Sequence, residues 1–176
     1  MFVASIINSL QAYNLLSKKN VRWLSKREMI KVELIFLPIY LFSVKLVDNR
    51  GRNLSDKISV DGIKGEFAFF KETDYEASST DSVNKFNCKL SETEARDIAV
   101  REYQRSLFRN NMKTRSDARI TDFSRGSFVF YPYWIGYFKR KSAYDFEVID
   151  AVSGSKQGIK MRPVFIDLLL QLSKNA

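Results

Sequence analysis

The sequence has 176 residues, of which 45% are hydrophobic and 14% aromatic, a composition typical of a folded chain of one domain or two small ones. It contains no histidine and one cysteine, which excludes histidine-dependent catalytic triads, histidine-ligated metal sites and a disulfide within the chain. The formal net charge of +9 fits nucleic acid, an anionic membrane or an acidic protein as a partner, and equally a basic protein with none of them.

Residues 1–17 have the apolar spacing of an amphipathic helix. The apolar side chains at this spacing are Val3, Ile6, Ile7, Leu10 and Tyr13. We expect them to form the buried face. The segment lacks the positively charged start of a secretory signal, and the apolar run at 34–44 is too short to cross a bilayer as a helix. These features, with the single cysteine, favour a cytoplasmic protein.

A basic cluster follows this helix and surrounds Trp23. Its members are Lys18, Lys19, Arg22, Lys26, Arg27 and Lys31. An amphipathic helix, a tryptophan and basic residues together are typical of an element that lies on a membrane surface. However, the polar face of residues 1–17 carries amides and hydroxyls rather than lysines, so contact with a membrane is the less favoured interpretation.

Strand-like alternation of apolar residues extends from Ile30 to Leu46 and predicts a strand with one buried face. Pro38 interrupts the run and lacks the N–H that a ladder requires, so we expect a bend, a bulge or an edge position there. The next run, 58–65, ends in Asp61 and a glycine that can adopt positive φ, which predicts a hairpin turn. We interpret Asp61 as a turn residue rather than a catalytic one.

A polar stretch and a second helix come next. Residues 71–87 are acidic and rich in Ser and Thr, which indicates a linker. Ser91 and Glu94 then form a capping box, and Ala95, Ile98, Ala99 and Tyr103 form the expected packing face. A basic stripe recurs every four residues on the other side of this helix: Arg101, Arg105, Arg109 and Lys113. The stripe is more typical of a solvated helix face than of a surface that tracks phosphates.

The second half repeats the order of features found in the first. FVFYPYWIGYFKR (128–140) aligns with LIFLPIYLFSVKL (34–46), and EVIDAVSG (147–154) aligns with ISVDGIKG (58–65). Matching features in a fixed order predict an internal duplication in which each copy is a helix followed by three strands. The predicted domains are a first repeat at 1–70, a linker at 71–87 and a second repeat at 88–176.

An aromatic cluster marks the predicted central strand of the second repeat. It consists of Tyr131, Tyr133, Trp134, Tyr137 and Phe138, next to a basic triplet at 139–141. The rings could stack on single-stranded nucleic acid, but they occupy both faces of the strand, which favours packing in the core. Beyond the second repeat, 163–173 reads as a helix with a proline in its first turn and apolar residues almost all round, so we expect it to be buried between sheets or against a partner.

The second repeat resembles the PepSY domain and, more loosely, the cystatin-like arrangement of one helix across an antiparallel sheet. The resemblance rests on Ala95 and Ala99 in the helix SETEARDIAVREY, and on Val148, Asp150, Ala151 and Gly154 in the hairpin YDFEVIDAVSGSKQG. It covers about half of the chain. It implies a non-catalytic regulatory or inhibitory module.

These observations predict an α+β protein of two PepSY-like or cystatin-like repeats that acts by binding and is not an enzyme. The sequence has no glycine-rich phosphate loop and no metal-ligand cluster, so we expect no cofactor and no metal. The leading hypothesis is a protein-interaction or regulatory module. The alternative is a nucleic-acid-binding protein that uses the basic clusters at 18–31 and 101–119. Its candidate contacts are Lys18, Lys19, Arg22, Lys26, Arg27, Arg101, Arg105 and Arg109.

Overall fold

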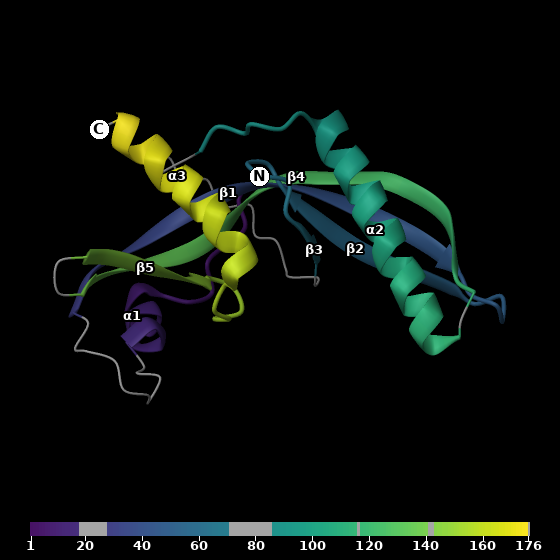
Figure 1. Ribbon diagram of the computed structural model, residues 1–176, viewed down its shortest axis with the longest axis horizontal. Coiled ribbons are helices and arrows are strands. Elements are labelled where there is room, and N and C mark those ends of the chain that lie inside the picture. The colour runs from purple at the N-terminus through teal and green to yellow at the C-terminus, as the bar shows by residue number, and fades with distance from the viewer. Residues whose placement is uncertain (18–27, 71–85, 116, 141–142, 176) are drawn as a thin grey trace. The chain divides into compact units, whose positions relative to one another are not determined.

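The computed structural model describes residues 1–17, 28–70, 86–115, 117–140 and 143–175. It has an α+β fold, as predicted, and its five-stranded sheet has the order β3-β2-β1-β4-β5 (Figure 1). The elements in chain order are α1 (Ser9–Ser17), β1 (Glu28–Val47), β2 (Asn53–Asp61), β3 (Phe67–Phe69), α2 (Glu92–Thr114), β4 (Arg119–Arg140), β5 (Ala143–Asp150), a 3-10 turn (Ile159–Met161) and α3 (Arg162–Asn175).

The chain forms two compact units, and each unit combines segments that are far apart in the sequence. Among the described residues, unit 1 is drawn from 1–37 and 130–175, and unit 2 from 38–70 and 87–129. Nearly all of the linker predicted at 71–87 lies outside the described residues.

Unit 2 is built around α2 and the β1–β2 hairpin. The buried residues of the helix are Ala95, Ala99 and Tyr103, at four-residue intervals, and they pack on the apolar face of β1 and β2. Two alanines at the contact let the helix approach the strands closely, while the ring of Tyr103 fills the space beyond them. The Tyr103 hydroxyl donates to Asp56 Oδ2 on β2 at 2.6 Å, which fixes the helix against that strand.

The ends of α2 follow from its sequence. The predicted capping box is present: Glu94 N–H donates to Ser91 Oγ, and Ser91 N–H donates to a Glu94 carboxylate oxygen at 2.8 Å. Two acidic residues in the first turn and Lys113 in the last complement the helix dipole. The helix ends at Arg115, whose φ of 51° lies in the left-handed region and whose N–H donates to Asn111 O.

Unit 1 has a helix on each face of its strands, α1 on one and α3 on the other (Figure 1). Trp134, Phe138 and Ile149 pack against α1, whereas Tyr133, on the opposite side of β4, meets Phe165 of α3 edge to face at 5.2 Å. Val164, Phe165 and Leu168 of α3 are buried, whereas its outer side is exposed at Ile166 and Leu170, so the helix is not buried between sheets.

The buried face predicted for residues 1–17 is correct at Val3 but wrong at Ile6, Leu10 and Tyr13. Asn8 and Gln11 cap the helix reciprocally, each backbone N–H donating to the other side chain at 2.9 Å, so the helix begins at Ser9. Ala12 and Leu16 are the buried positions, since they face Trp134 and Ile149. Three large apolar side chains expected inside are therefore exposed: Ile6, Leu10 and Tyr13.

Each helix packs on the hairpin that belongs to the other half of the sequence. The buried partners of α1 lie on β4 and β5 or just after β5, and those of α2 lie on β1 and β2. Partly buried side chains of β1 complete the cluster around α1, and those of β4 complete the cluster around α2. Three strands follow α1, whereas two strands and an isolated bridge between Ile149 and Lys156 follow α2. The third strand predicted for the second copy is thus reduced to one bridge.

The two hairpins end in turns with the same hydrogen bonds. Asp61 Oδ1 accepts from the N–H groups of the residues two and three positions later, and Asp150 Oδ1 does the same. Gly65 and Gly154 close the turns with φ of 79° and 73°, and each donates its N–H to the carbonyl of the aspartate. Both aspartates are turn residues, and Asp150 also accepts from the Tyr131 hydroxyl.

The two prolines also have matching positions. Pro38 and Pro132 each lie one residue before the hairpin ladder begins, at the pairs Ile39–Asp61 and Tyr133–Asp150. The ladder therefore does not require their missing N–H groups. Their carbonyls accept from Gly62 N–H at 2.8 Å and Ala151 N–H at 3.1 Å. Because β1 and β4 lie inside the sheet, the expected edge position is wrong.

We expect Tyr40→Phe to lower the free energy of unfolding by about 1 kcal/mol, because the Tyr40 hydroxyl donates to Leu90 O at 2.9 Å just before α2. Urea unfolding would measure the loss. Tyr144→Phe removes the same atom from a side chain that is mostly exposed, so it should leave the unfolding curve unchanged. Equal effects of the two changes would contradict a role for the Tyr40 hydroxyl in holding the helix.

Candidate binding surface

The basic residues proposed from sequence separate into two groups. The members of the first group, Lys18, Lys19, Arg22, Lys26 and Arg27, lie outside the described residues. Lys31, at the end of that cluster, is described and pairs with Glu33 on the same strand at 3.2 Å. The second group, Arg101, Arg105 and Arg109, lies on the exposed side of α2.

The arginines of α2 are partly neutralised along the helix. Glu102 lies between Arg101 and Arg105 and contacts both, with N–O distances of 3.6 and 2.8 Å. Phe108 and Met112 continue the same outward side, and both are mostly exposed. This face combines guanidinium groups with large apolar side chains. The basic stripe predicted the guanidinium groups but not the exposed Phe108 and Met112.

The aromatic cluster of β4 is part of the core, as its two-sided pattern predicts. Tyr131, Tyr133, Trp134 and Phe138 are buried. Their polar atoms are bonded within unit 1: the Trp134 Nε1–H donates to Ile7 O at 2.7 Å, and the Tyr131 hydroxyl donates to Asp150. Burial and a hydrogen bond to Glu33 raise the pKa of Tyr137. These rings are not available for stacking on nucleic acid.

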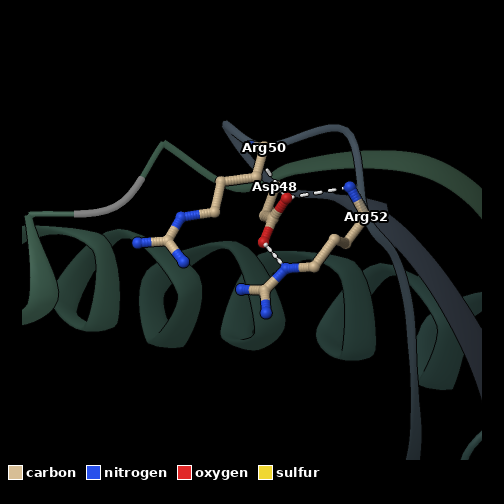
Figure 2. Close-up of polar contacts among 3 residues, drawn as sticks. All are labelled: Asp48, Arg50 and Arg52. Atoms are coloured by element: carbon tan, nitrogen blue, oxygen red, sulfur yellow. Dashed lines mark hydrogen bonds and ion pairs between the residues drawn. The ribbon is translucent and has the colours of Figure 1, made fainter.

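The β1–β2 turn presents two arginines that the sequence analysis did not single out (Figure 2). Asp48 Oδ1 accepts from the N–H groups of Arg50 and Arg52, both at 2.9 Å, and Asp48 Oδ2 accepts from Arg52 Nε at 2.7 Å. Gly51 allows the turn with φ of 73°. The backbone hydrogen bond from Arg52 is the main cause that lowers the pKa of Asp48, so its carboxylate stays charged at neutral pH.

Exposed apolar side chains on α1 and just before it form a second candidate surface. Leu10 and Tyr13 of the helix are 69% and 48% exposed, and their spacing of three residues makes them neighbours on the helix surface. Ile6, three residues before the helix begins, is 68% exposed. We call these three residues the apolar side of α1. The helix itself, Ser9–Ser17, contains no charged residue. This surface differs in chemistry from the outward face of α2.

Residues of β5, the 3-10 turn and α3 line a hollow of about 220 Å³ in unit 1. Its charged groups are engaged with one another: Lys156 pairs with Glu147 at 2.9 Å, and Arg162 pairs with Asp145 at 2.7 Å. The volume is below that of typical small-molecule sites. No group of His, Cys, Asp and Glu suited to a metal ion occurs among the described residues.

Cys88 in unit 2 also has only structural contacts. Its Sγ lies 3.1 Å from Leu90 O, 3.3 Å from Gly62 O and 3.4 Å from the Tyr40 hydroxyl. Burial and the neighbouring thiol raise the pKa of Tyr40 to about 12. The Tyr40 phenol is therefore protonated at neutral pH and acts as a hydrogen-bond donor to Leu90 O.

Within the described residues, no helix has both the length and the apolar character that crossing a bilayer requires. Comparison with protein-family models, with curated protein sequences and with solved structures finds no match to this chain.

Proposed function

We propose that this chain is a protein-interaction or regulatory module that acts in the cytoplasm by binding another protein and catalyses no reaction. The observation that carries the proposal is the exposed apolar side of α1. Folded monomers rarely leave contiguous large apolar side chains in water without a partner for them. Leu10 and Tyr13 are neighbours on the helix, as anchors that enter an apolar groove are, and Ile6 adds a third exposed apolar side chain just before the helix.

The chemistry of this surface favours a protein as the occupant. Nucleic acid is held chiefly through its phosphates, which require cationic side chains, and Ser9–Ser17 provides none. Burying the side chains of Ile6 and Leu10 in a partner would contribute on the order of 1.5–3 kcal/mol each. Tyr13 adds a ring and a hydroxyl, a combination enriched at protein interfaces.

The test compares two double variants that remove exposed apolar side chains from different helices. Ile6→Ser/Leu10→Ser changes the proposed surface, and Phe108→Ser/Met112→Ser makes the same kind of change on α2. Nuclease-treated extract of the native source would be passed over each immobilised protein. We expect proteins bound by the wild type to be lost from the first variant, by tenfold or more, and retained by the second.

Thermal unfolding of both variants should stay close to that of the wild type, because the altered side chains are mostly exposed. Equal retention of the bound proteins by both variants, or equal loss from both, would refute α1 as the interaction surface.

We also propose that the chain is an internal duplication of a PepSY-like or cystatin-like unit, with three strands in the first copy and a third strand reduced to one bridge in the second. Support comes from the paired turns of Asp61 and Asp150 and from the matching carbonyls of Pro38 and Pro132. Two further bonds match: the Tyr40 hydroxyl donates to the carbonyl one residue before the Ser91 cap, and Trp134 Nε1–H donates to the carbonyl one residue before Asn8.

A further inference from the structure

The β1–β2 turn contains Arg50, Gly51 and Arg52, and we call it the Arg-Gly-Arg turn. Hydrogen bonds within the turn order it without a ligand. Asp48 bonds the backbone of the turn and the Nε of Arg52, and its carboxylate is almost completely covered. The bond through Nε leaves the two terminal amino groups of Arg52 directed outward. Figure 2 shows the guanidinium groups of Arg50 and Arg52 extending to the same side of the turn. The two guanidinium groups therefore lie on the same side of an ordered turn, which reduces the conformational entropy lost when a ligand binds.

More basic side chains reach the same end of unit 2. Helix α2 starts beside Gly62, since Leu90 N–H donates to Gly62 O, and Tyr103 then bonds Asp56. From Tyr103, ten residues of helix rise about 15 Å. From Asp56 back to Arg52, four residues of strand cover about 13 Å. The last turns of α2 therefore end level with the β1–β2 turn.

The start of β4 lies beside the last turns of α2, because Asn111 Nδ2 donates to Ala118 O at 2.9 Å. The described residues of 48–52 and 109–119 contain two carboxylates, Asp48 and Asp117. These pair with Arg52 and Arg119. The basic side chains of the two segments are Arg50, Arg52, Arg109, Lys113, Arg115 and Arg119. We name these six residues the basic end of unit 2.

We propose that the basic end of unit 2 binds the phosphate backbone of nucleic acid. Guanidinium forks match the oxygens of a phosphate, and Arg52 is held with its fork outward. The Phe108 ring, 66% exposed and adjacent to Arg109, provides a face on which a base can stack. A phosphodiester chain engages several such contacts at once. This site lies on a different surface from the apolar side of α1.

The test is fluorescence anisotropy of a labelled 20-nucleotide single strand of mixed sequence, titrated at 50 and 150 mM salt. We expect dissociation constants of about 10⁻⁴ to 10⁻⁶ M near physiological salt, as for binding to the backbone without sequence preference. Arg50→Ala/Arg109→Ala/Lys113→Ala should reduce the slope of log affinity against log salt by about two, since each lost phosphate contact on a single strand is worth roughly 0.7.

A matched control removes the same charge from elsewhere. Arg96→Ala/Lys139→Ala/Lys160→Ala changes three exposed basic residues outside the basic end and should keep most of the wild-type affinity. Photo-cross-linking of a 4-thiouridine oligonucleotide to the wild-type protein gives a second measurement, with adducts expected within 48–52 and 105–119. Ile6→Ser/Leu10→Ser should bind the oligonucleotide like the wild type, so failure of the α1 proposal would be seen separately.

Equal weakening by the two triple variants would mean that net charge alone drives binding and would overturn the site. So would the absence of oligonucleotide binding by the wild type at 50 mM salt. Cosedimentation with vesicles containing 30% phosphatidylserine is the remaining arm. Vesicle binding that depends on Arg50, Arg109 and Lys113, without oligonucleotide binding, would assign the basic end to a membrane and refute nucleic acid.

Discussion

Replacing Asp61 with alanine is expected to lower the free energy of unfolding by about 3 kcal/mol. The side chain is 3% exposed, and its carboxylate accepts the N–H groups of Ile63, Lys64 and Glu66. Each donor left without a partner in a buried turn costs on the order of 1–3 kcal/mol. Water can reach part of this turn and bond some of the freed N–H groups. The expected loss of unfolding free energy is therefore at the low end of the range for three unsatisfied donors.

Asp61→Asn separates the contribution of charge from that of hydrogen bonding. Burial raises the pKa of Asp61, so the ionised carboxylate is held against a desolvation cost that asparagine does not incur. The amide oxygen can still accept from the N–H groups of Ile63 and Lys64. The amide nitrogen is a donor, so the N–H of Glu66 loses its acceptor. We therefore expect a smaller loss than for alanine. Urea unfolding at pH 7 would measure both.

Asp150→Ala is the matched control for Asp61→Ala. Asp150 makes the equivalent bonds to Val152 and Ser153 but is only half-buried, so water can replace it more easily. Asp150 also accepts from the buried Tyr131 hydroxyl, so the comparison is made in a Tyr131→Phe background, which removes that donor. We expect its loss to be clearly smaller than that of Asp61→Ala. Equal losses, or a loss below 1 kcal/mol at Asp61, would contradict burial as the reason for the difference.

Gly62→Ala is expected to destabilise unit 2 by about 1–3 kcal/mol, the usual cost of overpacking. A Cβ at this position would lie 2.4 Å from Cys88 Sγ and 3.2 Å from Pro38 O. The sulfur is the main obstacle. Adding Cys88→Ala to Gly62→Ala should therefore recover a substantial part of the lost stability, because it removes the atom with the shortest approach.

Gly126→Ala provides the contrast for this rescue. Its Cβ would meet the main chain of Leu41, with the carbonyl oxygen at 2.7 Å, so Cys88→Ala should not recover any of its loss. A double-mutant cycle for each pair would measure the coupling. Additive effects of Gly62→Ala and Cys88→Ala would show that the thiol does not limit the space at Gly62.

Local signals in the sequence predicted local structure well. The Ser91 capping box and the aspartate-to-glycine turns at 61–65 and 150–154 occur as expected, because each depends on hydrogen bonds within five residues. The two-sided aromatic pattern of β4 likewise indicated burial. The sequence pattern did not predict on which hairpin each helix packs. Helical spacing identifies an apolar face but does not say which of two similar hairpins that face will cover.

The errors at α1 and at the Arg-Gly-Arg turn have specific causes. Around α1, five apolar residues fitted one face, but the Asn8 cap and the small Ala12 determine which side approaches Trp134. The Arg-Gly-Arg turn was not identified from the sequence. An aspartate followed by a glycine three residues later, against four residues in the other two turns, was the available signal for an ordered loop.

The exchange of helices between the halves has a consequence for the order in which the protein folds. The bond that joins α2 to its hairpin, Tyr40 to Leu90, spans 50 residues, whereas the bond that joins α1 to its strands, Ile7 to Trp134, spans 127. During synthesis, unit 2 can therefore close while the C-terminal strands are still being made. Helix α1 is made before β4 and β5, so its contacts with Trp134 and Ile149 form only after those strands have been made. During this interval the apolar side chains that these contacts cover are open to aggregation or to a chaperone.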